Sequence, residues 1–194
     1  MLDASPLLEL AREVVRLLLD GYVGCLLLLG RRVAVPPQSL RDDLVIPLAA
    51  NFFTLTYNAV EWFPAWSQRS LCPVGWQGPL AITGLCLSVL GLAIALWAAV
   101  YLGRSFSILI EVKKVVLDGA YRWVRHPIYS GYLCLMIGLA LAHFSLAYFV
   151  LVPIHAFLLL YRARLEEVRL CEYSAEYREY RKRTGFVFPK VRLG

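Results

Sequence analysis

The side chains with the clearest chemical potential lie in one short stretch, residues 119–131, which reads Gly-Ala-Tyr-Arg-Trp-Val-Arg-His-Pro-Ile-Tyr-Ser-Gly. Pro127 has the fixed φ and the missing donor that suit the first turn of a helix, so a helix is predicted to begin at about His126. An apolar run starts at Tyr132, which places the motif where a helix enters a membrane. Amide donors and the positive end of the helix dipole at such a start favour an anionic group.

A second polar group follows the same apolar run. Residues 131–161 are apolar except near their middle, which predicts two helices joined as a tight hairpin. A hairpin brings its two ends together. Arg162 and Glu166, four residues apart on one helix face, are therefore expected to point toward His126 and Tyr129. Several kinds of polar side chain at one membrane depth favour a functional site over simple anchoring at lipid phosphates, whereas anchoring is preferred for Arg122 and Arg164.

Composition indicates a polytopic membrane protein, since 59% of residues are hydrophobic, 18% are charged and the mean hydropathy is +0.61. The net charge of +6 does not indicate a nucleic-acid partner, because the basic residues mostly flank apolar spans and no nucleic-acid motif accompanies them. Five scattered cysteines without a CxxC pair favour buried thiols over a metal site or a disulfide framework.

We expect an all-α membrane helix bundle with about five transmembrane helices in a single domain, residues 1–194. N-terminal spans occupy 1–79, and a catalytic core with the loop around residues 119–131, the hairpin and a C-terminal helix occupies 80–194. The expected elements are one tilted span up to residue 30, spans 44–66 and 80–102, the hairpin, and a cytoplasmic charged helix from 162 to about 185. Loop charges place the N-terminus outside and the C-terminus in the cytoplasm, and short loops favour a prokaryotic inner membrane. No secretory signal is expected.

The chain resembles the integral-membrane methyltransferases that include isoprenylcysteine carboxyl methyltransferase and, more remotely, phospholipid N-methyltransferases. The resemblance covers roughly residues 80–192. It rests on Gly119-x-Tyr121-x-x-x-Arg125-His126-Pro127-x-Tyr129-x-Gly131, Arg162-x-x-x-Glu166-Glu167, Tyr177-x-x-Tyr180 and Phe188-Pro189. It implies S-adenosylmethionine as the methyl donor, bound by the loop and the hairpin ends instead of a Rossmann domain, and the chain indeed has no GxGxxG.

The resemblance also assigns site residues by their position in the family motifs. Arg162 falls at the position that binds the methyl-accepting carboxylate, and Arg162 and Glu166 are the expected catalytic residues, with no metal ligand. The chain departs from the family between Glu167 and Tyr177, where one residue is missing and Tyr173-Ser174 replaces Phe-Gly. The implied cofactor contacts are Glu111, Lys113, Lys114, Val115, Val116, Tyr121, His126, Pro127, Ile128, Tyr129 and Glu166.

A lipophilic carboxylate, such as that of an isoprenylcysteine, is the preferred acceptor. Methyl transfer from a sulfonium cation to a carboxylate neutralises both charges and needs no general base, so a dry site with Arg162 as the carboxylate clamp would suit it. An amine or phenol acceptor, in a phospholipid or another small lipid, would need Glu166, Glu111 or His126 as base. Which lipid and which atom are methylated stay open at this point, as does the oligomeric state.

Two other readings compete. An NADPH-dependent steroid or enoyl-lipid reductase would be expected to show Pro-Asn-Tyr followed by Gly-Glu, whereas this chain has His126-Pro127-Ile128-Tyr129 and Gly131-Tyr132. A non-enzymatic membrane scaffold or transporter component leaves the converging polar residues unexplained, and no inverted repeat supports a transporter.

Overall fold

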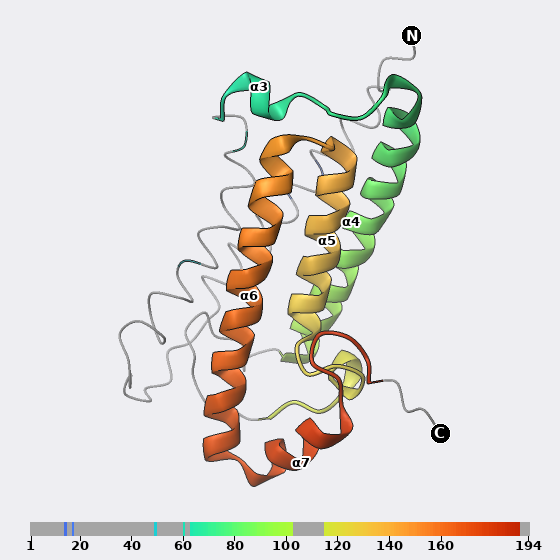
Figure 1. Cartoon of the computed structure of the whole chain (residues 1–194). Coiled ribbons are helices and arrows are strands. Elements are labelled where there is room, and N and C mark those ends of the chain that lie inside the picture. Colours follow the sequence, from blue (N-terminus) through green and yellow to red (C-terminus); the bar gives the residue numbers. More distant parts are fainter. Residues whose placement is uncertain are drawn as a thin grey trace.

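The computed structural model describes residues 63–102 and 115–190, together with the isolated positions 14, 17, 49 and 60. In this part of the chain every regular element is a helix, as predicted. Three long helices run side by side, with a short helix at one end and two at the other (Figure 1). The elements are α3 (Ala65–Gln68), α4 (Val74–Leu102), the 3-10 helix η4 (Gly119–Arg122), α5 (Pro127–His143), α6 (Leu146–Tyr173) and α7 (Ala175–Arg183).

Two of these helices are long and apolar enough to cross a membrane. They are α4, with 29 residues and a mean hydropathy of 2.3, and α6, with 28 residues and 1.7. The apolar α5 has 17 residues, about 26 Å at 1.5 Å per residue, against a hydrocarbon core of about 30 Å. These helices correspond to the last three predicted spans. The predicted span up to residue 30 and most of the span 44–66 lie outside the described residues.

The start of α4 differs from the prediction. Residues 67–79 were expected to form a loop, but α3 occupies its first part and α4 begins at Val74. Pro79 lies inside α4. As only the sixth helical residue it removes a single hydrogen bond near the helix start and does not end the helix. The span expected to end at residue 66 is also wrong in detail, because Phe63 and Pro64 are not helical and Ala65 begins α3.

Small residues, among them Gly84, Ser88 and Gly91 of α4, bring α4 and α5 into close contact. A Cβ atom added to Gly131 of α5 would lie 2.7 Å from the amide nitrogen of Ala95 and 2.9 Å from its Cβ. Ser88 Oγ donates to the carbonyl of Gly84 at 2.9 Å and lies 3.3 Å from that of Leu135 on α5. No larger side chain fits at these positions without moving a helix.

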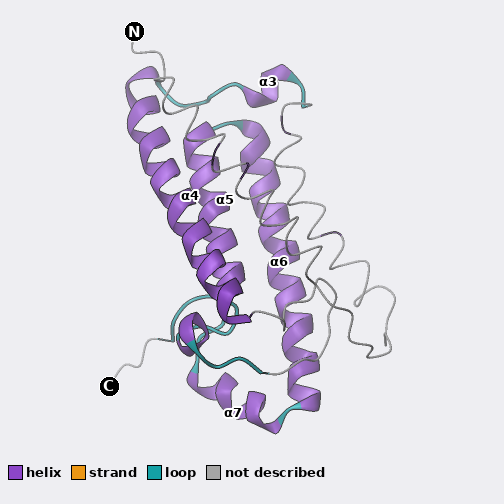
Figure 2. Ribbon diagram, turned by 180° about the vertical axis from the view of Figure 1, so that it is seen from behind, coloured by secondary structure: helices purple, strands orange, loops and turns teal. Residues whose placement is uncertain are grey.

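The predicted hairpin is present as α5 and α6 (Figure 2). Phe144 adopts a left-handed backbone conformation with φ of 44°, and its amide donates to the carbonyl of Ala140 at 2.8 Å. Ser145 is extended and buried before α6 begins. This two-residue turn sends α6 back along α5, so residues after 160 return to the level of the first residues of α5.

The charged tail was expected to form one separate helix from 162 to about 185, but the structure divides it between two helices. Its first part continues α6 as far as Tyr173, and Ser174 then breaks the helix with φ of −132° and ψ of 115°. Ser174 Oγ accepts a hydrogen bond from the amide of Tyr177 at 3.1 Å, which caps α7. The chain thereby turns, and α7 lies across the end of the bundle (Figure 1).

Candidate active site

The loop before α5 is shaped by one glycine and one proline. Gly119 begins η4 with φ of +60°, and a Cβ atom there would lie 2.6 Å from ring atoms of Tyr101 at the end of α4. His126 is the N-cap of α5 and Pro127 its first helical residue, as predicted. The loop is thus held between α4 and α5.

Residues 184–189, here called the C-terminal strap, run along this loop. Val124 and Gly185 form a parallel β-bridge. The amides of Arg125 and His126 each donate to the carbonyl of Phe186 at 3.1 Å. Ser130 Oγ, one turn into α5, donates to the carbonyl of Val187 at 2.6 Å. The strap therefore fixes the backbone on both sides of His126.

The carboxylate of Glu166 joins the two polar groups that the hairpin brings together. Its Oε1 accepts hydrogen bonds from Tyr129 Oη at 2.6 Å and from Arg162 Nε at 3.1 Å. Its Oε2 lies 3.8 Å from His126 Nδ1. The guanidinium of Arg162 also stands over the ring of Tyr129, 5.8 Å from its centroid. Arg162 and Glu166 do meet Tyr129 and His126, as the i, i+4 spacing and the hairpin predicted.

The neighbouring Glu167 makes a different set of contacts. It pairs with Nε of Arg125, and its Oε1 lies 3.5 Å from His126 Nε2. Its Oε2 lies 3.5 Å from Arg181 Nε on α7 and 3.8 Å from Arg164 Nη1. Adjacent helical residues point about 100° apart, so the two glutamates face different partners.

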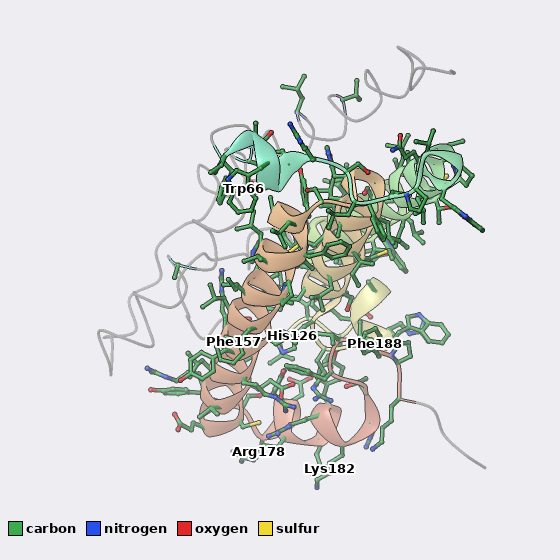
Figure 3. The ribbon with its side chains drawn as sticks, turned by 45° about the horizontal axis from the view of Figure 1, so that its top comes forward. Trp66, His126, Phe157, Arg178, Lys182 and Phe188 are labelled. Carbon is green, nitrogen blue, oxygen red and sulfur yellow. The ribbon has the colours of Figure 1, made fainter. Side chains whose placement is uncertain are left out.

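The imidazole of His126 is enclosed between these carboxylates and two aromatic rings. It stacks on Tyr129 with a centroid distance of 5.4 Å and meets the ring of Phe186 edge-on at 5.1 Å. Figure 3 shows His126 inside the end of the bundle that α7 covers, whereas the labelled Arg178 and Lys182 of α7 point away from it. The His126 ring is thus held in one orientation.

Burial separates the two glutamates. The side chains of Arg162 and His126 are each 6% exposed and that of Glu167 is 2% exposed, but that of Glu166 is 23% exposed. Glu166 is therefore the carboxylate of this cluster that a ligand can reach most readily.

Two tyrosines of α7 close the other side of the loop. Tyr180 Oη donates to the backbone carbonyls of Tyr121 and Val124, and burial raises the pKa of Tyr180 to about 12. Burial likewise raises the pKa of Tyr177 well above its usual range. Both are neutral phenols, and the hydroxyl of Tyr180 ties α7 to the loop before α5. Tyr173, in contrast, ends α6 and is 54% exposed.

The other residues with implied cofactor contacts fall into two groups. Tyr121, Pro127 and Ile128 are buried, and Val115 and Val116 are half-buried. Glu111, Lys113 and Lys114 lie outside the described residues, so their contacts remain predictions, and none of the assigned roles is tested by the geometry alone. No group of three or more metal-ligating side chains occurs among the residues that the structure describes.

Three residues of the cluster were given no role from the sequence. Arg125 and Glu167 stood in the motifs, and the Glu166-Glu167 pair was a signal that both carboxylates matter. Phe186 had no signal beyond its place just before the closing Phe188-Pro189, because its contact with His126 depends on how the strap folds back.

The comparisons agree with the motifs. The sequence model of the phospholipid methyltransferase family matches residues 80–173. The cobalt-zinc-cadmium resistance protein CzcN of Cupriavidus metallidurans is 35% identical over 125 residues, 61% of this chain and 53% of that protein. Protein-S-isoprenylcysteine O-methyltransferase B of Arabidopsis thaliana is 38% identical over 60 residues, 28% of this chain and 30% of that protein.

The chain thus matches about half the length of the first relative and under a third of the second. The family match begins within α4 and ends with α6, and so includes the loop before α5 and the residues Tyr129, Arg162 and Glu166. Over residues 80–173 the chain is thus similar to the phospholipid methyltransferase family, and this similarity agrees with the resemblance to membrane methyltransferases that its motifs predicted.

Proposed function

We propose that this protein transfers a methyl group from S-adenosylmethionine to a lipophilic acceptor, with a carboxylate as the preferred acceptor group. The observation that carries the proposal is the position of Arg162. It is the first charged residue after the apolar part of α6, it is buried, and its Nε bonds Glu166 beside Tyr129. An anionic head group on an apolar tail would meet a buried cation at the edge of the apolar region.

The side chains at this site carry the types of group that could bind S-adenosylmethionine, the methyl donor of these families. Glu166 offers a partly exposed carboxylate for an ammonium or hydroxyl group, and Tyr129 and Tyr121 offer aromatic rings. His126 Nε2 is buried and lies 3.5 Å from Glu167 Oε1. When bound, the cofactor supplies an electrophilic methyl group on a sulfonium sulfur.

In this proposal the protein acts by positioning and by excluding water. Arg162 holds the acceptor carboxylate and orients one oxygen toward the methyl carbon. That oxygen forms the new bond while the carbon–sulfur bond breaks, and no proton has to be removed. Glu166 Oε1 already accepts two hydrogen bonds, which favours a role in holding ligands over that of a general base.

We further propose that the site faces the cytoplasm. Six of the twelve residues 162–173 are charged, and α7 adds six more charged residues, with Arg181, Lys182 and Arg183 in its last turn. A basic segment directly after a span is typical of the cytoplasmic side. A lipid acceptor would then enter from the membrane and the water-soluble cofactor from the cytoplasm.

N-methylation of a phospholipid is the second candidate, favoured by the description of the matching family. The acceptor amine must lose a proton, so Glu166 or His126 would have to act as base. The reductase reading is disfavoured because the matched families are methyltransferases. A scaffold is disfavoured because it gives no reason for the buried polar cluster.

The test uses purified protein in nanodiscs with S-adenosylmethionine carrying a tritiated methyl group. The acceptors are N-acetyl-S-farnesylcysteine, its preformed methyl ester as the blocked control, and phosphatidylethanolamine, with NADPH consumption measured in parallel. We expect label only in the free acid, released by alkali as methanol. Arg162→Lys should raise the KM for the acid about tenfold, because a lysine loses the two-pronged hydrogen bonding of the guanidinium. Arg178→Lys is the control and should not change the KM, because Arg178 is exposed on α7 and points away from His126. Label in the amine alone would replace the carboxylate proposal with the second candidate.

A further inference from the structure

We propose that Glu167 is a positioning residue: through Arg125 it holds His126 and the C-terminal strap in one arrangement around the methyl-transfer site. Its role in catalysis rests on the proposed function, whereas the arrangement itself can be measured without any cofactor.

Several segments of the chain meet at Glu167. Its carboxylate contacts Arg125 and His126 from the loop, Arg164 from its own helix and Arg181 from α7. At 2% exposure the side chain is buried, and a buried carboxylate is retained only where cations and hydrogen-bond donors surround it.

The partners are unequal, which identifies the contact that matters. Arg164 and Arg181 are 60% and 45% exposed and lie 3.8 and 3.5 Å away, so water screens these pairs. Arg125 is 8% exposed and bonds Glu167 through Nε. The Arg125–Glu167 pair is therefore the contact most sensitive to loss of the carboxylate.

Arg125 carries the effect of Glu167 to the strap. Its Nη1 donates to the backbone carbonyls of Thr184 and Arg181, the latter at 3.1 Å. Its guanidinium also lies 5.7 Å from the centroid of the Phe186 ring, whose edge meets His126. With Nε held by Glu167, the guanidinium is aimed at the strap.

His126 is fixed by the same arrangement from two directions. Its backbone amide donates to the carbonyl of Phe186, and its ring lies between Glu166 and Glu167, at 3.8 and 3.5 Å. Loss of the Glu167 charge would release the Arg125 side chain, loosen the strap and remove one of the contacts that hold the His126 ring. The hydrogen bonds of Glu166 do not depend on Glu167, so Glu166 would stay in place.

The main variant is Glu167→Gln, which keeps the shape and removes the charge. The matched control is Glu179→Gln, because Glu179 forms an exposed ion pair with Lys182 at 2.6 Å on α7. Hydrogen exchange of the ligand-free protein is the first readout, since the amides of Arg125 and His126 bond the strap. We expect exchange in residues 119–131 at least about tenfold faster in Glu167→Gln and unchanged in Glu179→Gln.

The second readout separates positioning from general stability. At a temperature where both proteins are folded, Glu167→Gln should lower kcat about 100-fold, the cost of misplaced groups, with the acceptor KM little changed. Arg125→Lys keeps a positive charge but loses the guanidinium, which bonds Glu167 and the strap at once. It should show the same faster exchange and the same lower kcat. The double variant should lose no more kcat than either single variant, because both substitutions remove the same Arg125–Glu167 contact.

The outcomes decide between distinct failures. Wild-type exchange and wild-type kcat in Glu167→Gln overturn the positioning role, whatever the melting temperature does. If Glu167→Gln does not fold, Arg125→Lys decides by the same two readouts. If the wild-type protein transfers no methyl group, the proposed function fails, and the exchange comparison still shows whether Glu167 holds the strap.

Discussion

Replacement of Tyr129 by phenylalanine isolates one hydrogen bond of the site. The ring that stacks on His126 is kept, and only the hydroxyl that donates to Glu166 at 2.6 Å is removed. A hydrogen bond to a charged group contributes about 1.5–3 kcal/mol. Because Glu166 is 23% exposed, water can replace part of the lost bond. The lower figure therefore applies, which is about a tenfold rise in a dissociation constant if Glu166 binds the cofactor.

The assay is isothermal titration of S-adenosylhomocysteine into detergent-purified protein. Tyr173→Phe is the matched control, since Tyr173 is exposed at the end of α6. We expect a dissociation constant about tenfold higher for Tyr129→Phe and no change for Tyr173→Phe. Equal affinities for the wild type and Tyr129→Phe would refute the reasoning that Tyr129 orients Glu166 for the cofactor.

Three further predictions concern stability, measured by unfolding in detergent. Gly131→Ala should lower the free energy of unfolding by about 1–3 kcal/mol, because the added Cβ meets α4. Gly78→Ala, whose added Cβ would have nothing within 4 Å, should be neutral or stabilising. Equal stability of the two variants would show that α4 and α5 are not in close contact. Gly119→Ala should cost about 1–2 kcal/mol, since φ of +60° is unfavourable for alanine, and a neutral result would argue against this loop conformation. The pKa of Tyr180 is raised from 10.0 to about 12 in the folded state, so its contribution to stability is complete below pH 10 and is lost as the pH rises through 12; the wild type should lose more stability over that window than Tyr180→Phe, and parallel curves would contradict the burial of this phenol.

Residue preferences and helical spacing predicted the start of α5, the Arg162–Glu166 pair and the hairpin. The start of α5 at His126-Pro127 follows from the fixed φ of proline, and the meeting of Arg162 with Glu166 follows from helical spacing. The hairpin followed from an apolar run too long for one span. Once the hairpin was expected, the approach of Tyr129 to Glu166 was expected as well, although the two residues are 37 positions apart.

The rest depends on contacts that no local pattern encodes. The strap bonds α5 over a separation of 57 residues, between Ser130 and Val187, and Arg125 meets Glu167 over 42. The break at Ser174 was not predicted because the charged pattern continues through it, and only the cap on Tyr177 marks the new helix. The stretch 67–79 was interpreted as a loop because it contains prolines and glycines, although a proline in the second turn of a helix, such as Pro79, costs little.

The most direct test of the account is equilibrium binding of S-adenosylmethionine and S-adenosylhomocysteine to the detergent-purified protein. His126→Ala and Glu166→Ala are measured alongside, with Glu179→Ala as a folded control and NADPH as a control ligand. We predict saturable binding of both cofactor forms, weakened in the first two variants and unchanged in the control, with no binding of NADPH. A folded wild-type protein that binds neither form, or that binds them equally well without His126 and Glu166, would contradict the assignment of this cluster as a methyl-transfer site.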